Sequence, residues 1–148
     1  MSESGHAYWR VGAEAPTRRV GPVTRSHIVR YAGAGGDFNP VHHDETFAQA
    51  AGYPSVFAHG MLTAGILGGY VADWLGDDRL RKYCVRYVAQ VWPGDELILS
   101  GQVASVQGTA SGLIVDCQLA VHRQVEAGEP QLVLSGTAQA VVHDAQED

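Results

Sequence analysis

An aspartate and a histidine stand close together in the segment Asp37-Phe-Asn-Pro-Val-His42. A carboxylate and an imidazole can together accept and donate protons near neutral pH. Pro40 stiffens the connection, so the two side chains can be held near enough for one water molecule to bridge them. The same residue types also occur in structural turns, where Asp37 would cap a turn and His42 would be a hydrogen-bonded structural residue. Both interpretations stay open from the spacing alone.

A glycine, Gly60, follows His59 and comes directly before an apolar run from Met61 to Leu75 that predicts a buried helix. The first N–H groups of a helix have no partner within it and lie at its positive end, so the Gly60 N–H could bind an oxyanion. Without a side chain, Gly60 would let a substrate carbonyl approach that N–H. The alternative is structural, with Gly60 in a tight turn and His59 as a helix cap.

Neighbouring histidine and acidic residues raise the question of a metal site. The candidates are His42, His43, Asp44 and Glu45. Adjacent residues seldom direct their donor atoms at one ion, and the sequence has neither an HExxH motif nor a spaced cysteine pair. We therefore predict no metal site.

Two further segments could contact a substrate. A basic cluster could bind the phosphates of a cofactor-like substrate or an acidic carrier protein, or it could form a solvated strand edge. Its members are Arg79, Arg81, Lys82 and Arg86. The segment Tyr53-Pro-Ser-Val-Phe57 could line an acyl pocket, or it could close the core.

The composition is that of one globular domain. The chain has 148 residues, of which 45% are hydrophobic and 18% charged, which predicts a single domain over 1–148 with its core at about 11–142 and flexible ends. Its formal net charge of −6 argues against binding to nucleic acid or to an anionic membrane surface. The apolar stretch at 61–72 is too short to span a bilayer.

The two cysteines and the start of the chain bear on localisation. Cys84 and Cys117 lie in separate apolar-rich segments without CxxC spacing, so we expect packed free thiols and a reducing compartment. Residues 1–12 lack the basic start and the apolar run of a secretory signal. A cytoplasmic protein is the expectation.

The elements that must position these residues follow from the pattern. Thr24 is a plausible N-cap for a short helix, the glycine-rich segment 33–40 predicts a loop, and a second short helix is expected at 45–51. The central helix over 61–75 contains Gly65, Gly68 and Gly69. Each glycine costs about 1 kcal/mol relative to alanine, so we expect another element to pack very close at all three.

The rest of the chain predicts strands. Runs rich in β-favouring residues at 82–92, 96–107, 113–124 and 132–143 are separated by glycine- and proline-containing turns. In the third run, the apolar residues from Leu113 to Val121 alternate with Asp116 and Gln118, so one face is buried. A central helix followed by a four-strand antiparallel meander predicts an α+β domain whose sheet curls around the helix, which is the hot-dog architecture.

The segment Tyr31-Ala-Gly-Ala-Gly-Gly-Asp-Phe-Asn-Pro-Val-His42, with Ala48 and Ala58-His-Gly-Met-Leu62, resembles the hydratase-2 motif of the MaoC-like (R)-specific enoyl-CoA hydratases. The longer stretch 31–76 is also similar to the B subunit of (3R)-hydroxyacyl-ACP dehydratases. The resemblance covers about 11–142.

The resemblance implies an enzyme with a single hot-dog domain, acting as a homodimer or as a heterodimer with a second hot-dog subunit. It would reversibly hydrate trans-2-enoyl thioesters to (3R)-hydroxyacyl thioesters, with acyl-CoA or acyl-ACP as substrate. No metal or redox cofactor is implied, since CoA or phosphopantetheine is part of the substrate. Asp37 and His42 would be the catalytic dyad that holds the water, Asn39 would orient their loop, and the Gly60 N–H would polarise the thioester carbonyl.

We expect the substrate to be bound by residues around this dyad. They are Tyr53, Ser55, Val56, Phe57, His59, Met61 and Arg86. Two other functions stay open. One is a non-catalytic subunit that stabilises a partner or binds acyl thioesters, and the other is a thioesterase on the same fold.

Overall fold

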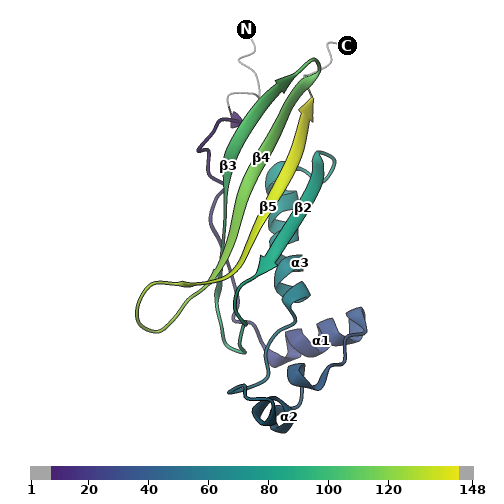
Figure 1. The fold of residues 1–148 in the computed structure, drawn as a ribbon, viewed down its shortest axis with the longest axis vertical. Coiled ribbons are helices and arrows are strands. Elements are labelled where there is room, and N and C mark those ends of the chain that lie inside the picture. Colours follow the sequence, from purple (N-terminus) through teal and green to yellow (C-terminus); the bar gives the residue numbers. More distant parts are fainter. Residues whose placement is uncertain (1–7, 144–148) are drawn as a thin grey trace.

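A curved antiparallel sheet packs around one long helix in the computed structural model, which describes residues 8–143 (Figure 1). The elements in chain order are β1 (Arg18–Val20), α1 (Arg25–Gly35), the short 3-10 helix η2 (Pro40–His42), α2 (Glu45–Ala50), α3 (Gly60–Leu75), β2 (Leu80–Tyr87), β3 (Leu97–Thr109), β4 (Gly112–Arg123) and β5 (Gln131–His143). The ends predicted to be flexible lie outside the described residues.

The strands follow the order β1-β3-β4-β5-β2, and every neighbouring pair is antiparallel. The predicted meander of four consecutive strands is therefore wrong for the first of them. Strand β2 pairs with β5, with Tyr83 opposite Ala138. The edge of β3 that β2 would have used is occupied by β1, where Arg19 lies opposite Ile98. In the view of Figure 1, the segment after β2 passes the lower ends of β5 and β4 to reach β3.

Helix α3 provides the apolar centre. Its buried residues include Leu67, Val71 and Leu75, which belong to one core cluster with sheet residues such as Leu99 and Val121. Removing this apolar surface from water is the main favourable contribution to folding. The helix and the curved sheet confirm the predicted α+β hot-dog fold. Among the residues that the structure describes, no helix is long and apolar enough to cross a membrane.

Helix α1 is longer than the sequence predicted. Thr24 is its N-cap, as expected, and forms a capping box with His27. The helix continues through Gly33 to Gly35 and ends at Gly36, which has a positive φ of 74°. Burial of Ile28 on its inner face offsets the small cost of glycine within a helix. The predicted loop at 33–40 is thus reduced to the few residues before η2. Strand β2 is shorter than predicted and ends at Tyr87 rather than at position 92.

The glycines of α3 differ from one another. A side chain at Gly68 would lie 3.5 Å from the ring of Tyr83, but Gly65 and Gly69 have no atom of this chain within 4 Å of that position. Within the described part of this chain, the expected close packing is therefore found at Gly68, whereas Gly65 and Gly69 leave an open strip on the helix. Cys84 also departs from expectation, because it is exposed on β2 while Cys117 is buried.

Candidate active site

The turn after α1 fixes the position of Asp37. The backbone N–H of Asn39 donates to Asp37 Oδ1 at 3.2 Å, and Asn39 Oδ1 accepts from the N–H of Val41 at 3.2 Å. The second bond caps η2, whose first residue is Pro40, a favourable first position because proline needs no N–H partner there. One carboxylate oxygen of Asp37 is therefore held by the turn, and the other is free to face the site.

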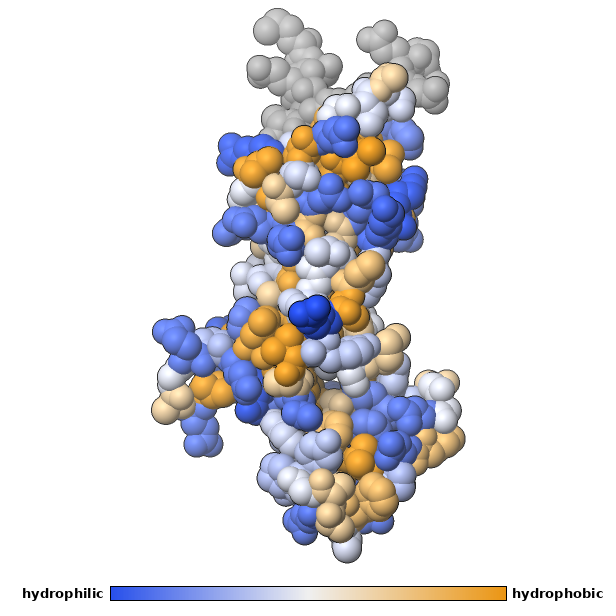
Figure 2. Space-filling view, in the orientation of Figure 1, coloured by the Kyte–Doolittle hydropathy of each residue, from blue (hydrophilic) through white to orange (hydrophobic). Residues whose placement is uncertain are grey.

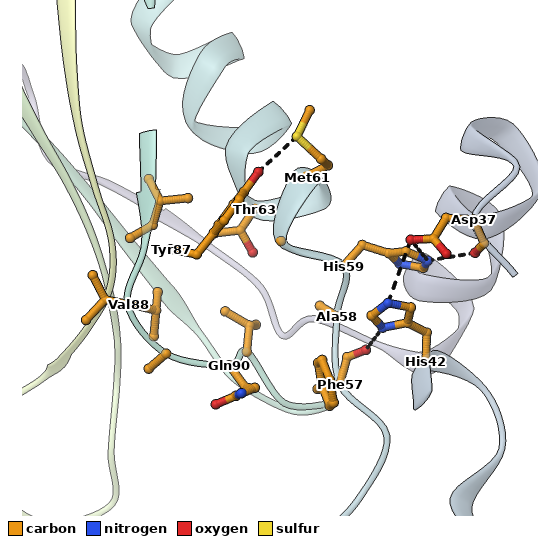
Figure 3. Close-up of a pocket in the computed structure, with 15 residues that line it drawn as sticks. Asp37, His42, Phe57, Ala58, His59, Met61, Thr63, Tyr87, Val88 and Gln90 are labelled. Carbon is orange, nitrogen blue, oxygen red and sulfur yellow. Dashed lines mark hydrogen bonds and ion pairs between the residues drawn. The ribbon is translucent and has the colours of Figure 1, made fainter. Parts of the chain in front are cut away.

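His42, the last residue of η2, is buried beside Asp37. Its Nδ1 lies 2.7 Å from the Phe57 carbonyl oxygen, so Nδ1 carries the proton and donates to that carbonyl, leaving the Nε2 lone pair free. Nε2 lies 3.9 Å from Asp37 Oδ2 (Figure 3). This separation is too long for a direct hydrogen bond, and it suits one water molecule bridging the two atoms.

The surroundings of His42 keep its ring uncharged. Desolvation by burial is the largest effect and lowers the pKa of His42 below its ordinary value of 6.5. The hydrogen bond to Phe57 and the charge of Asp37 oppose this shift, whereas His59 and His43 reinforce it. A neutral imidazole with Nε2 facing Asp37 can accept a proton at physiological pH.

His59 lies against both members of the dyad. It occupies the N-cap position of α3 but makes no capping hydrogen bond through its side chain. Its Nε2 lies 3.0 Å from the backbone oxygen of Asp37 and 3.9 Å from Asp37 Oδ2. Its ring stacks on His42 with 3.8 Å between centroids. The side chain therefore contacts Asp37 and His42 rather than capping the helix terminus.

Gly60 begins α3 and opens into a cavity of about 420 Å³ that also reaches the dyad (Figure 3). The first N–H groups of a helix have no partner within the helix. A Cβ at Gly60 would lie 2.8 Å from the ring of Tyr87, so the ring can rest here only because residue 60 is glycine. The cavity thus combines a carboxylate, a neutral imidazole and the positive end of a helix.

The sequence matches the model of the MaoC like domain over residues 9–116. This chain belongs to the MaoC-like domain family. It is 47% identical over 76 residues to 3-hydroxyacyl-thioester dehydratase X of Mycobacterium tuberculosis, a match that covers 51% of this chain and 26% of that protein. The chain thus spans about a quarter of the length of this relative.

One further relative and one solved structure each cover most of this chain. The (R)-specific enoyl-CoA hydratase of Rhodospirillum rubrum is 27% identical over 120 residues, which are 81% of this chain and 80% of the hydratase. A chain in the crystal structure of the ChsH1-ChsH2 complex from Mycobacterium tuberculosis has a TM-score of 0.76 at 23% identity, covering 90% of this chain and 98% of that chain. This structural similarity establishes that the two chains share a fold.

Some of the residues expected to bind substrate line the cavity of this MaoC-like domain, and others do not. Phe57, His59 and Met61 line it, together with Asp37, His42 and Gly60. Of the rest, Tyr53 packs on Phe57 with 4.7 Å between ring centroids, Ser55 Oγ accepts a hydrogen bond from Arg25, and Val56 is buried in the interior.

Arg86 lies outside the cavity. It is exposed on β2, between Val85 and Tyr87. Val85 packs against the core and Tyr87 lines the cavity. Because successive side chains of a strand point to opposite faces, Arg86 is directed away from the cavity.

The sequence did not identify the wall that closes the cavity opposite the dyad. This wall consists of the end of β2 with the segment that follows it, the start of β5, and one residue of α3; its members are Tyr87, Val88, Ala89, Gln90, Val91, Val133, Leu134 and Thr63. The only signal in the sequence is that several of them are apolar residues near strand ends, which is true of many core residues as well.

Three side chains of the site could in principle hold a metal ion. Asp37, His42 and His59 each offer one donor atom, and all three atoms lie within 4.8 Å of one another. This set differs from the cluster at 42–45 that the sequence raised. The Nε2 of His59 is already bonded to the Asp37 carbonyl, so ligation through that atom would break the bond. The absence of a metal site stays a prediction.

Proposed function

We propose that this MaoC-like domain adds water to trans-2-enoyl thioesters to give (3R)-hydroxyacyl thioesters, and catalyses the reverse dehydration. The observation that carries the proposal is the 3.9 Å separation of His42 Nε2 and Asp37 Oδ2 in the cavity that Gly60 opens into. The named activities of the relatives, an (R)-specific enoyl-CoA hydratase and a 3-hydroxyacyl-thioester dehydratase, support the same reaction.

In the proposed reaction, His42 Nε2 accepts a proton from the bridging water as the water oxygen bonds to C3 of the enoyl group. The resulting imidazolium returns this proton to C2, and the Asp37 carboxylate orients the water and stabilises the imidazolium. The Gly60 N–H stabilises the negative charge that develops on the thioester oxygen. In this proposal His42 and Asp37 activate the water and the Gly60 N–H stabilises the charge, so no metal or redox cofactor takes part. CoA or phosphopantetheine enters as part of the substrate.

The pH dependence follows from the state of His42. Its pKa is lowered by burial, so the ring stays neutral and active until the pH falls through this lowered value. We expect kcat/KM to rise with pH with a midpoint below 6.5, the ordinary pKa of histidine. Steady-state rates at a series of pH values test this, and a midpoint above 6.5 would contradict the assignment of His42 as the proton acceptor.

A second candidate function is that of a subunit that needs a partner hot-dog chain. Strand β2 is an edge of the sheet formed by the described residues, and unpaired strand edges readily accept another strand. Met61, Tyr87 and Val88 are exposed beside it, and apolar residues gather on this face where the sheet meets the lower helices (Figure 2). The likeness to a chain of the ChsH1-ChsH2 complex agrees with such pairing.

One experiment separates these functions. Purified protein is mixed with crotonyl-CoA and then with a longer trans-2-enoyl-CoA, and loss of the enoyl absorbance is followed together with chiral analysis of the product. We expect the (3R)-hydroxyacyl-CoA. Release of free thiol, detected with a chromogenic reagent, would indicate a thioesterase. An inactive chain that is monomeric by light scattering and gains activity with a second hot-dog chain would identify a partner-dependent subunit.

A further inference from the structure

We propose that His59 is a positioning residue for the reaction proposed above, fixing the main chain at Asp37 through its Nε2–H and the ring of His42 through stacking. The inference rests on the proposed function for its kinetic consequences. The residues involved come from three segments that become neighbours only in the folded chain. These segments are the turn after α1, the end of η2 and the start of α3.

The first observation is the hydrogen bond between His59 and Asp37. The donor Nε2–H and the Asp37 carbonyl oxygen are 3.0 Å apart and belong to residues separated by 22 positions. The His59 side chain is 2% exposed, so the donor side of this bond is shielded from water. The bond acts on the backbone of Asp37 while Asn39 holds one carboxylate oxygen, and together they leave Oδ2 facing His42.

The second observation is that the His59 ring contacts two other rings. Tyr31 of α1 lies against His59 with 5.0 Å between ring centroids and the planes tilted by 53°, and His42 stacks on His59 at 3.8 Å with 27° between the ring planes. His42 is additionally held by the Phe57 carbonyl. The Phe57 carbonyl thus holds Nδ1 of His42 while the stacked His59 ring limits movement of the His42 ring toward that side (Figure 3).

The third observation concerns the other nitrogen of His59. Its Nδ1 is buried and has no hydrogen-bond partner within the described part of the chain, which is costly for a polar atom. A phenylalanine would fill the same space without this penalty. What histidine supplies at position 59, and phenylalanine would lack, is the N–H donor to the Asp37 carbonyl.

The charged and titratable groups around the dyad come from each neighbouring segment. Asp37 lies in the turn after α1, His43 follows His42 at the end of η2, and His59 precedes α3, while Tyr31 faces His59 from α1. His59 is among the groups that lower the pKa of His42. His59→Phe and His59→Gln remove this contribution, so we expect the pKa of His42 to rise and the acid limb of kcat/KM to move to higher pH.

The test compares two substitutions of His59. His59→Phe keeps the ring and its stacking but loses the donor, and His59→Gln keeps an N–H donor near the position of Nε2 but loses the ring. We expect His59→Phe to lower kcat by about 10²-fold with a small change in KM, because the dyad is misplaced rather than the substrate released. We expect His59→Gln to recover a large part of this loss, and both variants to show the shifted acid limb.

The outcomes separate this inference from the proposed function. Wild-type activity that is lost in Asp37→Asn but unchanged in His59→Phe would overturn the positioning role and leave the function standing. Long-range ¹H–¹⁵N spectra of the wild-type protein provide a readout independent of activity and of how the variants fold. We expect the Nε2-protonated tautomer for His59 and the Nδ1-protonated tautomer for His42. An Nδ1-protonated His59 would overturn the inference even in an inactive protein.

Discussion

Replacing Asp37 with asparagine is expected to lower turnover of crotonyl-CoA by about 10² to 10⁴-fold, because the proton transfer through His42, which usually contributes this much, depends on the Asp37 carboxylate. The variant loses the negative charge that orients the water and stabilises the His42 imidazolium. Asparagine keeps an oxygen that can accept from the Asn39 N–H, and the Asp37 side chain is 54% exposed, so we expect the fold to survive. Absorbance assays measure kcat, and circular dichroism checks the fold.

Asp73→Asn is the matched control for this prediction. Asp73 is an exposed carboxylate of α3 that pairs with Arg18 at 2.8 Å, far from the cavity-lining residues. Exposed ion pairs contribute little to stability, so we expect this variant to keep wild-type turnover. If Asp37→Asn were equally active while folded, the proposed mechanism would be wrong, and Asp37 would be a structural turn residue.

Gly60→Ala is expected to lower kcat/KM by about 10² to 10³-fold, the effect of removing one donor from an oxyanion site. The added methyl group would occupy the space in front of the helix N-terminus, where the thioester oxygen must approach the N–H. It would also meet the ring of Tyr87 at 2.8 Å. That ring is 52% exposed and can shift, so we expect a folded protein with a defective site.

Two controls make the Gly60 prediction specific. Gly65→Ala places a methyl group on the same helix where no atom of this chain lies within 4 Å, and we expect unchanged activity with a gain in stability of up to about 1 kcal/mol. Gly60→Ala combined with Tyr87→Ala removes the collision with the ring. If this double variant were as active as Tyr87→Ala alone, the defect would come from displacing Tyr87 rather than from blocking the N–H.

Features that depend on neighbouring residues were predictable from the sequence. The cap at Thr24, the turn around Asp37 and the start of the long helix all follow from local residue preferences. The alternation in β4 similarly identified its buried face. Because Asp37, His42 and Gly60 lie in or beside such local features, the sequence could name them before their distances were known.

Features that depend on contacts between distant segments could not be predicted. Local preference does not tell whether β2 pairs with β3 or with β5, and in the fold β1 occupies the edge of β3 while β2 pairs with β5. The cavity wall formed by Tyr87 and Leu134 follows from this pairing, since the two residues lie opposite each other in the β2–β5 register. The contact of His59 with the Asp37 carbonyl likewise depends on how α1 is placed beside α3.

The separation of the cavity into two sides has an evolutionary consequence. The groups proposed to move protons and stabilise charge lie within one continuous stretch, residues 37–60, whereas much of the opposite wall comes from the segment after β2 and from the start of β5. Substitutions in those distant segments can reshape the space for the acyl group while the reacting groups stay in place. Substrate range can therefore change in evolution independently of reaction type. A descendant of such a chain could accept new substrates while it keeps the same reacting residues.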